Sequence, residues 1–130
     1  ALDMVNFGGH ETVPKAFAER KLHVHNAQVT LMRTTSEELR EIARFITRKL
    51  NGARGPLTIL LPEKGVSLID KEGMPFDDPE AREALFSELE ATFETTENRS
   101  IRRVDADIND PAFSDAVVQA FLKVHAAANS

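Results

Sequence analysis

The chain has 130 residues, of which 42% are hydrophobic and 28% are charged, and its formal net charge is −5. These values fit one soluble folded domain, and the scattered charges argue against nucleic acid or a membrane surface as partners. The absence of cysteine excludes disulfides, thiolate nucleophiles and cysteine metal sites. No apolar run reaches the roughly 18 residues that a membrane helix needs. We therefore expect a cytoplasmic protein.

Extended apolar runs open the chain. Residues 2–7, 21–25 and 29–32 each have the composition of a β-strand. A native protein rarely begins inside a strand, so the run at residues 2–7 indicates that a further portion of the protein precedes these residues. We therefore expect residues 1–130 to form a single α/β domain that is the C-terminal lobe fragment of a longer chain.

An amphipathic helix is predicted next. Apolar residues recur at helical spacing from Leu39 to Leu50, and Thr35 with Glu38 has the signature of a capping box at its start. Residues 57–61, Leu-Thr-Ile-Leu-Leu, are nearly all apolar, as expected for a central strand covered on both faces. The stretch from Pro62 to Pro79 is the longest irregular segment and a candidate functional loop.

The last third of the chain repeats the alternation of helix and strand. Residues 81–93 and 113–128 carry helical apolar stripes, each after a proline in the first turn. Residues 101–108 alternate between apolar and charged side chains, which predicts a strand near the sheet edge with Asp105 and Asp107 on its wetter face. The alternation predicts an α/β fold with a mainly parallel open sheet flanked by helices, Rossmann-like in kind.

One candidate binding site lies at the start of the first helix. In open α/β sheets, ligands bind beyond the carboxyl ends of the strands, near helix N-termini. Arg33, Thr34 and Thr35 combine a guanidinium, two hydroxyls and the free amides of a helix start, which suits a phosphate or carboxylate. The alternative is that Thr35 only caps the helix and Arg33 is a surface charge.

Two further loops contain candidate ligand contacts. The side chains of His25 and Asn26 can orient a ligand or, alternatively, fix the loop that follows them. In the segment from Lys64 to Ser67, Gly65 permits close backbone approach and the lysine can meet an anion, although a plain turn explains it equally well. The chain has neither GxxxxGK[ST] nor GxGxxG, so a phosphate site here is of another kind.

The remaining polar clusters favour neither a metal nor a reaction. His23 and His25 share a strand face without a visible third ligand, and no metal site is predicted. Asp78 before a proline has the pattern of a helix cap. No nucleophile with its base is evident, so the sequence leaves open whether the protein is an enzyme.

Several unusual sequence segments resemble a known family, the ATP-binding domain family of the tomato mosaic virus resistance protein and its bacterial relatives. The similarity extends over nearly the whole chain and corresponds to the C-terminal part of that domain. The matching segments are residues 1–8, 11–14, 25–26, 29–35, 55–56, 60–62, 65–67, 75–76, 78–81 and 109–113.

The resemblance implies a two-lobed α/β protein that binds ATP, with or without Mg. Its N-terminal lobe lies outside these residues and is an expected partner, and we also expect a homo-oligomer. The residues that fall in matching motifs and have suitable chemistry are His25, Asn26, Arg33, Thr34, Thr35 and Ser67. Ala27 departs from the proline expected after His-Asn, which puts the geometry of that loop in doubt.

The sequence is therefore interpreted as a nucleotide-binding module that holds phosphate at the N-terminus of a helix. On this hypothesis Arg33→Ala weakens ATP binding. Two alternatives stay open: a self-association or protein-interaction domain without its own ligand site, and one lobe of an enzyme acting on a small phosphorylated or carboxylated metabolite.

Overall fold

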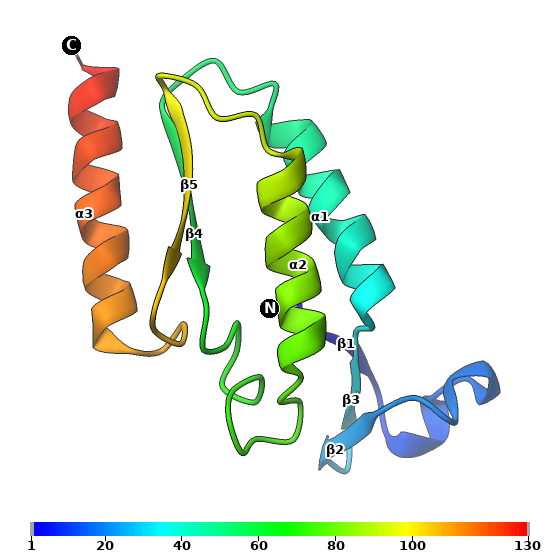
Figure 1. The fold of residues 1–130 in the computed structure, drawn as a ribbon. Coiled ribbons are helices and arrows are strands. Elements are labelled where there is room, and N and C mark those ends of the chain that lie inside the picture. Colours follow the sequence, from blue (N-terminus) through cyan, green and yellow to red (C-terminus); the bar gives the residue numbers. More distant parts are fainter. Residues whose placement is uncertain (1, 130) are drawn as a thin grey trace.

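The computed structural model describes residues 2–129, which form two small β-sheets and three α-helices (Figure 1). Two short 3-10 turns, His10–Thr12 and Lys15–Phe17, lie between the first two strands. The strands are β1 (Met4–Phe7), β2 (Leu22–Asn26), β3 (Val29–Arg33), β4 (Leu57–Pro62) and β5 (Arg99–Val104), and the helices are α1 (Ser36–Leu50), α2 (Pro79–Thr92) and α3 (Pro111–Ala128).

The predicted α/β class is confirmed, but only one of the two sheets is parallel. Strands β4 and β5 pair in parallel, whereas β1, β3 and β2 form an antiparallel sheet in that order. The prediction of a mainly parallel sheet was wrong for these three strands. For β2 and β3 the reason is that only Ala27 and Gln28 separate them. A connection of two residues allows only an antiparallel hairpin, since a parallel pair requires a crossover of a dozen or more residues.

The parallel pair β4–β5 lies between α3 on one side and α1 with α2 on the other (Figure 1). The main core forms where α1 and α2 pack on each other and on β4. Its buried side chains are Leu39, Ala43, Leu61, Ala81, Leu85, Phe86 and Leu89. The α3 side is thinner, because Phe113 is the one buried residue of that helix.

The helix boundaries follow the predicted capping residues. Thr35 and Glu38 form the full capping box of α1. The carboxylates of Asp78 and Asp110 accept hydrogen bonds from backbone amides in the first turns of α2 and α3, each of which has a proline there.

The strand predicted for residues 101–108 ends early, at Val104. Asp107 does not lie on the wet face of a strand, because its carboxylate accepts the amide of Asn109 at 2.8 Å and turns the chain. That local hydrogen bond competes with the sheet ladder, as aspartate side chains commonly do. The turn brings residues 105–108 to the carboxyl end of β4, where Asp107 forms an isolated bridge with Gly65.

An exposed ion network ties β5 to α2, and it yields a prediction about acid stability. Arg103 donates to Glu83 at 2.7 and 2.8 Å and to Glu90 at 2.9 and 2.8 Å. The hydrogen bonds from Arg103 lower the pKa of Glu83 to about 2. A lowered pKa means that the network stabilises the fold fully above the ordinary value of 4.5 and loses this effect as the pH falls toward 2.

Arg103→Gln is therefore expected to reduce the urea midpoint at pH 6, with a difference from the wild type that shrinks steadily between pH 4.5 and about 2. Urea unfolding at several pH values checks this. A difference that is independent of pH would contradict the role given to Glu83.

Candidate functional site

The loop between β4 and α2, residues 63–78, organises the polar centre of the molecule. Near its start, Gly65 has a φ of +153°, and the Gly65 amide donates to the carbonyl of Pro62. The hydroxyl of Ser67 accepts hydrogen bonds from the amides of Ile69 and Asp70 at 3.3 and 3.1 Å. These contacts fold the loop back on itself and direct the Asp70 carboxylate inward.

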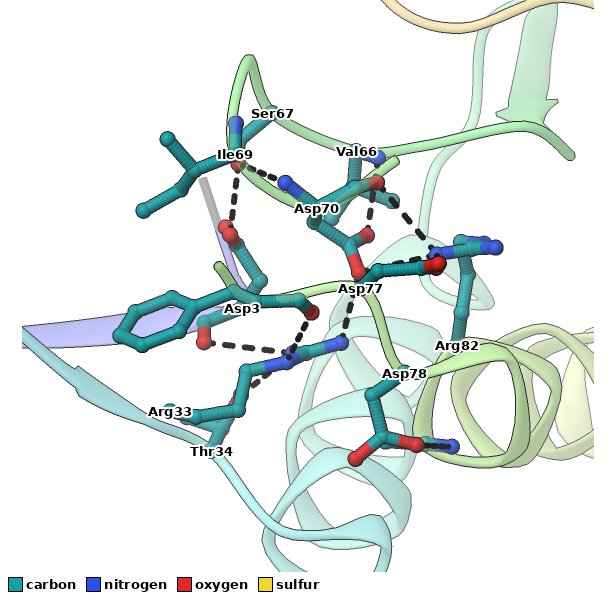
Figure 2. Close-up of polar contacts among 12 residues, drawn as sticks. Asp3, Arg33, Thr34, Val66, Ser67, Ile69, Asp70, Asp77, Asp78 and Arg82 are labelled. Carbon is teal, nitrogen blue, oxygen red and sulfur yellow. Dashed lines mark hydrogen bonds and ion pairs between the residues drawn. The ribbon is translucent and has the colours of Figure 1, made fainter. Parts of the chain in front are cut away.

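Asp70 is the centre of a buried ion cluster (Figure 2). Its Oδ1 lies 2.8 Å from Arg33 Nη2 and 2.9 Å from Arg82 Nη1, and its side chain is 0% exposed. Burial raises the pKa of the Asp70 carboxyl, while the amide of Val66 and the two guanidiniums oppose that rise. The cluster joins β3, the loop and α2 through one carboxylate, so each element depends on the other two.

Each nitrogen of the Arg33 guanidinium has an acceptor inside the chain. Nε donates to the carbonyl of Phe76, Nη1 donates to the carbonyl of Asp3 and to the Thr34 hydroxyl, and Nη2 donates to Asp70. The Asp3 carboxylate is also buried and accepts the Ser67 hydroxyl at 2.6 Å. Arg33, Thr34 and Ser67, which were assigned from the sequence to two separate candidate sites, thus lie close together, and their polar atoms face one another within the chain.

A cleft of about 670 Å³ opens beside this cluster. It lies beyond the carboxyl ends of the parallel strands β4 and β5 and next to the N-terminus of α2, which is where open α/β sheets bind ligands. Eight residues line it: Glu63, Lys64, Lys71, Glu72, Asp77, Pro79, Arg82 and Asp107.

Three cations of the cleft differ in how firmly they are held. Arg82 is nearly buried and donates to Asp70 and to the carbonyl of Glu63, whereas its Nη2 makes no hydrogen bond to residues 2–129. Lys64 and Lys71 are more exposed and pair with Asp105 at 2.9 Å and Asp107 at 3.3 Å. The Lys64 pair is exposed and contributes little to stability, whereas the Lys71 pair is partly buried. Neither lysine is held as firmly as Arg82, so both ammonium groups can exchange their partners for a ligand.

One carboxylate of the cleft, Asp107, is held in its charged form by its neighbours. The hydrogen bond from the amide of Asn109 and the neighbouring Lys71 hold the pKa of Asp107 below its ordinary value. The cleft therefore presents ammonium and guanidinium groups beside carboxylates. Such a mixture can bind phosphate oxygens directly and a phosphate-bound Mg²⁺ through one or two carboxylates.

The predicted phosphate site at the start of α1 has a different arrangement. The Thr35 hydroxyl accepts the amide of Glu38, and the Glu38 carboxylate accepts the amide of Thr35. The hydrogen bond from Arg20 lowers the pKa of Glu38, which keeps a negative charge at this helix end. Thr35 is thus a helix cap, and the Glu38 carboxylate already occupies the place at the positive end of the helix dipole where a phosphate would bind.

His25 and Asn26 lie apart from the other predicted residues. Both are exposed at the end of β2, and the Asn26 side chain accepts the amide of Gln28 at 2.9 Å, which fixes the tight turn to β3. This turn is at the opposite end of β3 from Arg33. The alternative given for Asn26, that it fixes the following loop, describes its observed contact.

Four charged residues of this region were not singled out from the sequence: Asp3, Asp70, Lys71 and Arg82. One signal was available, because Arg33 ends a strand that is otherwise uncharged, and a buried arginine is usually paired with a carboxylate. The sequence alone does not identify which of the many acidic residues supplies it.

Fold and site together define an α/β domain with a charged cleft at the carboxyl edge of a parallel strand pair. The chain belongs to the uncharacterised protein family UPF0261, whose C-terminal domain matches residues 1–125. It is 52% identical over 124 residues to a UPF0261 protein of Rhizobium meliloti and 47% identical over 124 residues to the ToMV resistance protein Tm-1(GCR237) of Solanum lycopersicum. A UPF0261 protein of Clostridium tetani is 45% identical over 124 residues. The predicted family resemblance is confirmed.

The chain spans only part of these relatives. The alignments cover 95% of this chain but 31% of the Rhizobium protein, 30% of the Clostridium protein and 16% of the tomato protein. Within the described residues, no helix is long and apolar enough to cross a membrane.

Proposed function

We propose that this domain binds the phosphate groups of a nucleotide, with ATP as the first candidate, in the cleft between the loop 63–78 and the turn at residues 105–108. The observation that carries the proposal is the convergence of Lys64, Lys71 and Arg82 on one cleft beyond the carboxyl ends of β4 and β5. ATP is the candidate because of the family resemblance stated above.

In this proposal Arg82 is the fixed cation. Asp70 and Asp77 orient its guanidinium from the inner side, at 2.9 and 3.6 Å. An arginine held in this way binds a phosphate without first losing side-chain freedom, which favours affinity. Lys64 and Lys71 then close on the ligand from the loop, and Mg²⁺ enters with the phosphates as its main ligands.

Two of the residues predicted to contact the ligand have a supporting role in the proposal. Arg33 and Ser67 hold the loop in place through Asp70 and Asp3, so they affect the site through its geometry. Arg33→Ala is accordingly expected to weaken ATP binding together with stability, whereas a direct phosphate contact would weaken binding alone.

Calorimetric titration with ATP, with and without magnesium, tests the proposal. Lys71→Ala is expected to weaken binding by about tenfold, because it removes a charge-assisted hydrogen bond to phosphate. Lys123→Ala, which removes an equal charge from exposed α3, is the matched control and should leave the affinity unchanged. Equal affinities for wild type, Lys71→Ala and Lys123→Ala would overturn the assignment of the cleft.

A further inference from the structure

Strand β4 has the composition of a central strand but lies at a sheet edge. Residues 57–61 contain no charge, and central strands of parallel sheets have such apolar runs because both of their faces are covered. Within residues 2–129, however, β4 pairs only with β5. Its neighbour has the opposite character, since three of the six residues of β5 are arginines, and charge is a common protection of edge strands.

The unpaired edge of β4 is open to hydrogen bonding. The amides of Leu57 and Glu63 point toward the β5 side, where they donate at 2.8 Å to the carbonyl of Asn98, just before β5, and at 3.0 Å to that of Val104. Because bonding direction alternates along a strand, the amides of Thr58 and Leu60 point to the other edge. Neither a bulge nor a proline interrupts the ladder before Pro62.

Apolar cavities flank this edge on both faces of the sheet. One of about 560 Å³ separates β4 from α3 and is lined by Leu60, Phe113 and Phe121 among others. Another of about 230 Å³ is lined by Ile59, Leu60 and Leu61 together with side chains of α1 and α2. Successive residues of a strand point to opposite faces, so a cavity lined by these three neighbours wraps around the edge of β4.

Helix α3, on one side of this edge, also leaves large apolar side chains exposed. Phe121 is 62% exposed and Leu122 is 53% exposed. A strand placed beside β4 would cover part of the Phe121 side of this helix as well as the cavity below it. Strand β4 thus has one unpaired edge with apolar surface on both of its faces.

We propose that the edge of β4 pairs with a β-strand, apolar on both faces, from the part of the UPF0261 polypeptide that lies outside this domain. The bacterial relatives are about three times as long as the region that matches this chain, so a polypeptide of this family has ample length for such a segment. Such a strand continues the ladder of β4 and extends the parallel pair into a larger sheet. The inference does not depend on the proposed nucleotide site.

Hydrogen exchange of single amides tests the pairing directly. The chain alone is compared with the same chain placed in the full-length Rhizobium relative, in place of its matching region. The amides of Thr58 and Leu60 are expected to exchange at least about tenfold more slowly in the longer protein. The outward amides of Ile101 and Arg103 on β5 are the internal control and should change little. Unchanged exchange at Thr58 and Leu60 would overturn the proposal.

A substitution gives a second, independent reading. Thr58→Pro removes an amide that β5 does not use and places a ring on the open edge, whereas Thr58→Ala keeps the amide. Relative to Thr58→Ala, the proline should raise the unfolding equilibrium constant about tenfold or more in the longer protein and clearly less in the chain alone. Equal effects in both contexts, or protection of Thr58 that appears in the isolated chain as its concentration rises, would contradict pairing with the rest of the polypeptide.

Discussion

Asp70→Ala is expected to lower the free energy of unfolding by about 3 to 5 kcal/mol, the largest effect of any substitution considered for this domain. The change leaves the guanidiniums of Arg33 and Arg82 in a buried site without their shared carboxylate. An uncompensated buried charge costs far more than a lost exposed pair, since water can no longer solvate it. Urea or thermal unfolding measures the loss.

The matched control is Asp105→Ala. Asp105 also pairs with a cation, Lys64, at 2.9 Å, but both side chains are more than half exposed. Its removal should leave the unfolding midpoint close to that of the wild type. If the two alanine variants were equally stable, the buried cluster would not hold the loop as described.

The second large effect is expected for Gly65→Ala, at about 2 kcal/mol or more. The φ of +153° is rarely adopted by residues with a side chain, and a Cβ built there lies 2.2 Å from the carbonyl oxygen of Asp70. Because the obstacle is backbone, the loop must move as a whole, and Asp70 moves with it. The variant should therefore lose both stability and ATP affinity.

Gly55→Ala controls for the general effect of adding a methyl group. A Cβ at Gly55 has nothing within 4 Å, and no positive φ constrains the residue. Unfolding and ATP titration of both variants separate a local clash from a nonspecific effect. A Gly65→Ala protein as stable as Gly55→Ala would show that the loop is not packed as tightly as the structure indicates.

Sequence patterns predicted the helices well because their signals are local. Thr35 and Glu38 cap α1 as their spacing indicates, and the prolines at 79 and 111 begin α2 and α3. The strand predicted for residues 101–108 was too long, also for a local reason. The alternation of side chains persists beyond Val104, but Asp107 turns the backbone with its own carboxylate. Periodicity alone does not record that competition.

The candidate site was only partly predictable, because its geometry depends on contacts between distant residues. The segment from Lys64 to Ser67 was recognised as a phosphate candidate, and the structure places Lys64 in the cleft. The partners Asp70 and Arg82 come from elsewhere, and Arg33 lies 37 residues from Asp70 in the chain. Without a folded chain, nothing distinguishes an arginine that binds a ligand from one that holds a loop.

The central claim is that phosphate binds in the cleft beyond β4 and β5, and mapping of backbone amide chemical shifts during a titration with ATP tests it most directly. The account predicts that the saturable shifts gather at Lys64, Lys71, Arg82 and Asp107. The amides of residues 35–38, at the start of α1, should move little. Shifts centred on the α1 start, or no saturable shift anywhere in the folded domain, would contradict it.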